Sequence, residues 1–226
     1  MPPLNQLIVP DEALIVANTA PVRPTVLPEL QLRLVTIEQA WWTADPDDLS
    51  KQGIVDPYWA FCWPGGTALA RLLLDHPALV RGRRVLDIGS GCGVAAIAAR
   101  RAGASCVVAN DIDPWALKSA AINAELNDVS LAYDSRDLIG ASLDACDTLL
   151  LGDVTYAKDL VANLLPWFAA LHARQMRILI ADPQRGFLPQ DWQPTWQVKV
   201  PAEIDADLSH WVQVPIYEYG VWDQEG

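Results

Sequence analysis

Residues 83–98 read RRVLDIGSGCGVAAIA, and this stretch predicts a buried strand, a tight glycine turn and a helix. Val85, Leu86 and Ile88 form a short apolar run, and an alanine-rich helical pattern follows the turn. The turn glycines, Gly89, Gly91 and Gly93, allow backbone angles that other residues avoid and let the backbone approach a ligand. The helix start behind them offers free N–H groups. The stretch is therefore typical of a nucleotide-binding cradle.

The spacing of these glycines indicates which kind of cradle it is. Dinucleotide sites use G-x-G-x-x-G, but here the third glycine comes one residue earlier, which disfavours an NAD oxidoreductase. Asp87 ends the strand before the first glycine, where its carboxylate can accept hydrogen bonds from a cationic or hydroxylated ligand. The arrangement resembles motif I of the S-adenosylmethionine-dependent class I methyltransferases. A purely structural glycine turn is the alternative.

Length and charge restrict the class of protein. The 226 residues, about half of them apolar, suit one α/β domain, which we place at residues 51–226 behind an N-terminal extension, residues 1–50, with a short helix and a strand. The formal net charge of −12 argues against a nucleic-acid partner, because phosphate backbones need clustered Lys and Arg. An acidic surface suits a basic protein or a cationic small molecule, or serves solubility alone.

The cysteines and the apolar runs bear on location. The four cysteines, Cys62, Cys92, Cys106 and Cys146, lie far apart without a C-x-x-C pair, so we expect reduced thiols and no metal site. No apolar run reaches the length of a membrane span, and the N-terminus lacks the pattern of a signal peptide. The sequence predicts a protein of the bacterial cytoplasm that does not bind membranes and is monomeric.

Alternating strand and helix patterns predict the architecture. Asp11 is expected to cap a short helix, and residues 30–34 to form a half-buried strand that residues 35–37 extend. Further strands are expected at residues 85–88, 105–109, 131–133, 148–151, 176–181, 196–200 and 211–222, and helices at 67–74, 94–102, 114–127 and 160–172. This order predicts an α/β fold, a Rossmann-like class I sheet of seven strands with helices on both faces and a C-terminal antiparallel hairpin.

Carboxylates follow the second and third strands of this sheet. Asp111 ends the second strand, beside the glycine turn, where a carboxylate can bind the hydroxyls of a ribose. A helix cap is the alternative for Asp111, although Asp113 before Pro114 is better placed for that role. Asp137, after the third strand, can accept from an adenine amino group, with Asp134 as the alternative.

The loop after the fourth strand reads GDVTY, residues 152–156. Ligands of open α/β sheets bind outside the carboxyl ends of the strands, where the strand order reverses, so the donor methyl should point at this loop. Asp153 and Tyr156 can hold a nucleophile there, and such a pair suits an amine better than a carbon acid. The alternative for Asp153 is a cap of the following helix.

Several motifs together resemble the seven-strand protein-lysine methyltransferases of methyltransferase family 16. The resemblance covers roughly residues 28–190 and rests on Asp56-Pro57-Tyr58-Trp59-Ala60, Trp63-Pro64-Gly65-Gly66, Val85 to Gly93, Ala109 to Pro114, Gly152-Asp153-x-x-Tyr156 and Asp182-Pro183-x-Arg185-Gly186. It implies that Asp153 and Tyr156 are the Asp-x-x-Tyr pair at the target lysine. The residues expected at S-adenosylmethionine, or at its product S-adenosylhomocysteine, are Trp63, Asp87, Gly89, Ser90, Gly91, Gly93, Asp111, Ile112, Asp137 and Gly152.

The resemblance also implies the partner, a protein with exposed lysines, and within the family it points to the electron transfer flavoprotein β subunit. Another protein, such as a ribosomal one, or a small amine is the nearest alternative substrate. A non-catalytic nucleotide-binding module is an alternative of a different class. Two side chains stay open: Trp59 belongs to the core or to the rim of the site, and Arg185 meets an acidic feature of the substrate or closes a loop.

Overall fold

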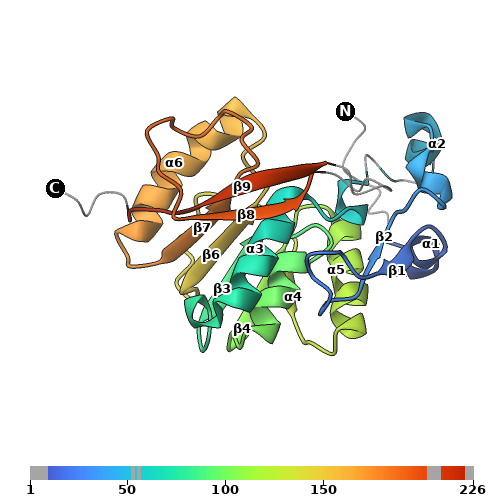
Figure 1. Cartoon of the computed structure of the whole chain (residues 1–226), viewed down its shortest axis with the longest axis horizontal. Coiled ribbons are helices and arrows are strands. Elements are labelled where there is room, and N and C mark those ends of the chain that lie inside the picture. Colours follow the sequence, from blue (N-terminus) through green and yellow to red (C-terminus); the bar gives the residue numbers. More distant parts are fainter. Residues whose placement is uncertain (1–9, 52–53, 55–56, 203–209, 222–226) are drawn as a thin grey trace.

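The computed structural model describes residues 10–51, 54, 57–202 and 210–221. Asp56 of the aromatic motif, the expected end of the last strand at Trp222 and residues 203–209 between the last two strands lie outside the described residues. Within them, seven strands form one sheet in the order β5-β4-β3-β6-β7-β9-β8 (Figure 1). The strands are Arg84–Ile88 (β3), Cys106–Asn110 (β4), Ala132–Asp134 (β5), Thr148–Gly152 (β6), Arg177–Ala181 (β7), Trp196–Pro201 (β8) and Trp211–Glu218 (β9).

Strand β3 lies at the point where the strand order reverses. It pairs in parallel with β4 on one side and with β6 on the other, and β5 and β7 continue the parallel pairing outward. Strand β9 runs antiparallel to both β7 and β8, so the C-terminal hairpin forms one edge of the sheet. The predicted fold class is confirmed.

Helices cover both faces of this sheet because successive strand residues point to opposite sides. Val85 of β3 packs into the cluster made with α3 (Pro64–Asp75) and α4 (Val94–Arg101), whereas the next residue, Leu86, packs into the cluster made with α6 (Lys158–His172). Helix α5 (Pro114–Leu126) contacts α4 and β4. The connection from β5 to β6 contains no helix, and its apolar side chains pack into the α6 cluster.

The N-terminal elements pack on α5. They are α1 (Glu12–Ala17), β1 (Ala20–Val22), β2 (Leu32–Leu34), η1 (Ala40–Trp42), α2 (Pro46–Lys51) and η2 (Tyr58–Ala60). Two buried asparagines at the C-terminal end of α5 bind the backbone beside and within β2. Oδ1 of Asn127, the residue directly after α5, accepts from the N–H of Gln31, and Oδ1 of Asn123 within α5 accepts from that of Arg33. Helix α1 contacts α5 as well (Figure 1). The extension is thus packed onto the domain, and α2 runs across the predicted boundary at residues 50 and 51.

Two expectations about local structure need correction, and one short strand was not expected. The strand before residue 35 does not extend to residue 37, because the chain leaves β2 after Leu34. Helix α3 begins at Pro64 rather than Thr67. Proline suits this first-turn position because the backbone N–H that it lacks would have no acceptor within the helix. The short strand β1 was not predicted. The Asp11 cap is confirmed, since its side chain accepts from the N–H of Ala13 at 2.8 Å.

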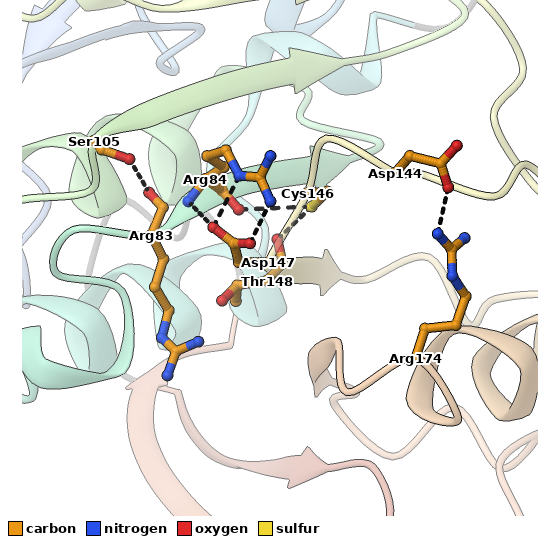
Figure 2. A network of polar contacts seen from close by, with 8 residues as sticks. All are labelled: Arg83, Arg84, Ser105, Asp144, Cys146, Asp147, Thr148 and Arg174. Atoms are coloured by element: carbon orange, nitrogen blue, oxygen red, sulfur yellow. Dashed lines mark hydrogen bonds and ion pairs between the residues drawn. The ribbon is translucent and has the colours of Figure 1, made fainter.

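A polar network joins the amino ends of the central strands (Figure 2). Arg84 at the start of β3 binds Asp147, just before β6, through Nε at 3.0 Å and Nη2 at 2.6 Å. The backbone N–H of Arg84 also donates to Asp147. In the same network Arg174 pairs with Asp144. The bonds between Arg84 and Asp147 hold the register of β3 and β6 at the end of the sheet opposite their carboxyl ends.

No helix among the described residues has the length and apolar character needed to cross a membrane. The described part of the chain also contains no cluster of three or more His, Cys, Asp or Glu that could hold a metal ion.

Candidate functional site

The glycine turn joins β3 to α4 as predicted. Gly89, Gly91 and Gly93 have φ angles of 65°, 51° and 80°, in the left-handed region that favours glycine. Gly93 is also fixed by packing, because a Cβ there would lie 2.9 Å from Ala120 Cβ on α5. A Cβ on Gly89 would lie 2.7 Å from Val154 Cγ1. A Cβ is therefore excluded at the first and the third glycine of the turn.

Asp87 lies beneath this turn. Its side chain is buried, and Oδ2 accepts a hydrogen bond from the N–H of Ala96 in the first part of α4 at 3.0 Å. Burial raises the pKa of Asp87 to about 7; the nearby charge of Asp111 acts in the same direction, and the bond from Ala96 opposes it. The predicted cofactor residue thus anchors α4 and holds a carboxyl group whose charge a neighbouring cation would stabilise.

Asp111 connects the end of β4 to the glycine turn. Its Oδ2 accepts from the N–H of Gly91 at 3.0 Å, and its Oδ1 accepts from the N–H of Asp113 at 3.0 Å. Burial raises the pKa of Asp111 above its ordinary value, although these two N–H groups oppose the shift. Asp113 caps α5 by accepting from the N–H of Trp115, as predicted. The helix-cap alternative for Asp111 is therefore taken by Asp113.

Three features of this corner suit a nucleoside. Each oxygen of Asp111 accepts one backbone hydrogen bond and keeps acceptor capacity for a hydroxyl group. Ile112 beside it is 71% exposed, which leaves an apolar side chain open for a flat ring. Ser90 in the turn is buried, and its hydroxyl has no hydrogen-bond partner within the described ranges of the chain. The residues present therefore fit an adenosine-type ligand.

The two acidic residues considered for the adenine lie at the end of β5 (Asp134) and in the loop after it (Asp137). Asp134 forms an ion pair with Arg136 at 2.6 Å, so its carboxylate already has a partner two residues away. Asp137 is exposed, and its Oδ1 accepts from the N–H of Ile139. Of the two, Asp137 has no ion pair within the part of the chain that the structure describes, which keeps it as the predicted acceptor for an adenine amino group.

Asp153 follows β6, and the structure gives it partners that the sequence did not predict. Its φ of 61° is unusual for a residue with a side chain. Oδ2 accepts from the N–H of Gly66 in the first turn of α3 at 2.9 Å, and Oδ1 lies 3.2 Å from Nη2 of Arg185. Burial raises the pKa of Asp153, and the Gly66 N–H and Arg185 oppose the shift. The expected alternative, a cap of the next helix, is wrong, because α6 begins after Ala157 without a side-chain cap.

Gly152 permits this arrangement. A Cβ at Gly152 would lie 2.7 Å from the backbone N of Gly66, so β6 and the start of α3 approach each other as closely as glycines allow. Gly152 therefore has a packing role in the structure. Its contact with a cofactor stays a prediction. Tyr156, the second predicted catalytic residue, lies in the same loop between β6 and α6 and is 61% exposed.

The tryptophans near α3 divide into core and rim. Trp59 is buried, stacks on Trp115 with 6.1 Å between ring centroids and meets Trp41 edge-on, so it belongs to the core. Trp63 is partly exposed directly before α3, and its Nε1 donates to the carbonyl of Tyr58 at 2.7 Å. The indole is thereby held in place directly before α3. Its expected contact with the cofactor stays a prediction.

Known proteins resemble this chain at the level of family and fold. Residues 41–165 match the family model of the ribosomal protein L11 methyltransferases. The electron transfer flavoprotein beta subunit lysine methyltransferase of Danio rerio is 45% identical over 76% of this chain and 67% of its own length. That of Xenopus laevis is 43% identical over 76% of this chain and 70% of its own length. A solved structure from Pyrococcus horikoshii, of a candidate RNA methyltransferase, shares the fold with a TM-score of 0.51 at 17% identity, over 76% of this chain and 92% of that one.

Proposed function

Because the chain belongs to the family of the electron transfer flavoprotein beta subunit lysine methyltransferases, we propose that it transfers methyl groups from S-adenosylmethionine to lysine side chains of a partner protein. Family membership makes the chain a methyltransferase. The proposed substrate is the electron transfer flavoprotein β subunit, as the relatives' names state for those proteins. A bacterial origin and a cytoplasmic location stay predictions of the sequence, and so does the monomer.

One observation carries this proposal: Asp153 follows β6, and the glycine turn follows β3, its direct parallel neighbour. A ligand in the turn and an acceptor at Asp153 would therefore meet at the carboxyl ends of adjacent strands. S-adenosylmethionine, when bound, supplies an electrophilic methyl group. The glycine turn would hold its amino-acid part and Asp111 its ribose, while Ile112 and Asp137 would contact the adenine.

The protein's own residues then have to present a lysine. A free lysine has a pKa of about 10.4, so its amine is protonated near neutral pH and must lose that proton before it attacks. Asp153 would bind the incoming nitrogen, and the exposed ring of Tyr156 would line the channel for the lysine stem. Trp63, whose indole Nε1 donates to the carbonyl of Tyr58, would form a wall of the site. Positioning in a water-poor site supplies the rate, since no covalent intermediate with the protein is needed.

The L11 family model favours a second candidate substrate, a ribosomal protein. Both substrates are proteins, so one experiment separates them. Purified chain is incubated with S-adenosylmethionine and either electron transfer flavoprotein or ribosomal protein L11, and the products are read by mass spectrometry. Methylated lysines on the flavoprotein β subunit support the first proposal. Methylation confined to L11 would transfer the proposal to the second candidate, and an unmodified pair would refute both.

A further inference from the structure

The segment after β7 carries Arg185 on a firmly held turn. Asp182 is 3% exposed, and its backbone N–H donates to the carbonyl of Pro215 in β9. Its Oδ1 accepts from the N–H of Arg185 at 2.9 Å, which closes the turn. Gln184 and Gly186 have φ angles of 61° and 81°. The backbone from which the Arg185 side chain extends is thus held in place by β7, by β9 and by the bond to the Asp182 side chain.

The guanidinium is directed to Asp153. Nη2 lies 3.2 Å from Oδ1, and the side chains of Arg185 and Asp153 are 32% and 10% exposed. The other carboxylate oxygen of Asp153 is occupied by the N–H of Gly66. Within the described ranges, no other lysine or arginine forms an ion pair with Asp153. The guanidinium of Arg185 is therefore the positive charge beside Oδ1, the oxygen of Asp153 that could bind the incoming lysine nitrogen.

We propose that Arg185 is a positioning residue that acts through Asp153, and that it sets the lower pH limit of methyl transfer. The proposal rests on the function proposed above. Burial opposes the charged form of Asp153, and the guanidinium favours it, so Arg185 keeps the carboxylate ionised and oriented. The same positive charge disfavours the ammonium form of a lysine bound beside it, which favours the neutral amine. Loss of Arg185 would shift both groups in one direction, toward higher pH.

Other groups lie close to Asp153 or to Arg185. Cys62, before α3, interacts with it electrostatically, and α3 itself contributes the uncharged N–H of Gly66. Asp182 lies at the end of β7, where burial raises its pKa and Arg185 lowers it. Tyr156 belongs to the loop of Asp153 itself. All of these groups remain in an Arg185 variant, so a shift between variants reports on the guanidinium.

The test compares Arg185→Gln, which removes the charge, with Arg185→Lys, which keeps one. Arg174→Gln is the matched control, because it removes a surface ion pair at the amino ends of the strands. The first readout needs no substrate: the carboxyl carbon of Asp153, labelled with carbon-13 and assigned by its loss in Asp153→Asn, is titrated by NMR. We expect the Asp153 midpoint to rise by about one pH unit in Arg185→Gln, the low end for a lost charge partner because Arg185 is partly exposed.

The second readout is the pH profile of single-turnover methylation. Its acid limb should move upward in Arg185→Gln by a similar amount, while Arg185→Lys and Arg174→Gln follow the wild type and all variants bind S-adenosylhomocysteine equally. An unchanged Asp153 midpoint in Arg185→Gln overturns the proposal, and so does an equal shift in Arg185→Lys. Arg185→Ala serves as a second variant if Arg185→Gln does not fold. A wild type that methylates nothing refutes the proposed function, whereas the titration still decides the role of Arg185.

Discussion

The carboxylate of Asp153 and the backbone N–H of Gly66, 87 residues apart in the chain, form a hydrogen bond of 2.9 Å. This bond joins the loop after β6 to the positive end of α3, where an anion is stabilised by the helix dipole. A residue expected to meet the substrate is therefore also part of the framework. The same close approach explains why glycines stand at residues 65 and 152, since a Cβ at either position would lie within 3 Å of the facing segment.

Asp111→Ala should weaken cofactor binding. Each ribose hydrogen bond to the charged carboxylate contributes about 1.5–3 kcal/mol, so the loss should exceed tenfold in affinity. The matched control is Asp113→Ala, which removes the cap of α5 and costs about 1 kcal/mol of stability without touching the ribose. Calorimetry with S-adenosylhomocysteine measures both. Equal affinities for wild type and Asp111→Ala would contradict the ribose assignment.

The carboxyl of Asp87 should make stability depend on pH. Its pKa is about 7 in the folded chain and about 3.9 when unfolded, so between these values only the folded state holds the proton. The free energy of unfolding should therefore fall as pH rises from about 4 to 7, by about 1.4 kcal/mol per unit at most. Asp87→Asn should flatten this part of the curve. Urea denaturation at pH 5 and pH 7.5 checks it, and parallel pH dependences of variant and wild type would refute the assignment.

Gly152→Ala should destabilise the protein. The new Cβ would meet backbone atoms of Gly66 at 2.7 Å and 2.8 Å, and forcing these segments apart costs about 1–3 kcal/mol. Gly66→Ala is the control, because among the described residues its Cβ would meet Val94 Cγ1 alone, at 3.2 Å, and that side-chain methyl can shift. Chemical denaturation should separate the two variants. Similar stabilities of the two variants would show that a Cβ fits between α3 and β6, and would contradict the packing role of Gly152.

Much of this fold could be predicted, because its signals are local. The apolar run before Gly89, the glycine spacing and the Asp113-Pro114 start of α5 each act within a few residues, and each was located correctly. The pairing of Asp153 with Arg185 could not be predicted, since it depends on how the ends of β6 and β7 are placed. Strand β1 was missed because it has three residues and contains Pro21, which gives no strand pattern. The burial of Trp59 depends on Trp41 and Trp115, which are distant in sequence.

Methylation of a protein substrate should slow as salt rises. The net charge of −12 would attract a lysine-bearing partner, and at physiological salt the Debye length has fallen to about 8 Å, which screens that attraction. The measurement is the methylation rate at limiting substrate from low to physiological ionic strength. Single-turnover rates with saturating substrate are the control and should change little. A rate at limiting substrate that ignores salt would assign the charge to solubility.

Single-turnover methylation by Asp153→Asn, measured beside cofactor affinity, tests the central claim most directly. The asparagine can still accept from the N–H of Gly66, so α3 and the cofactor site should persist, while the charge that meets the acceptor is lost. We expect an unchanged affinity for S-adenosylhomocysteine and a methyl-transfer rate reduced by about 10²–10³-fold, as for a positioned polar contact in a water-poor site. Tyr156→Phe, which keeps the ring, should lose less. Transfer by Asp153→Asn at the wild-type rate would contradict the account and reduce Asp153 to a structural cap of α3.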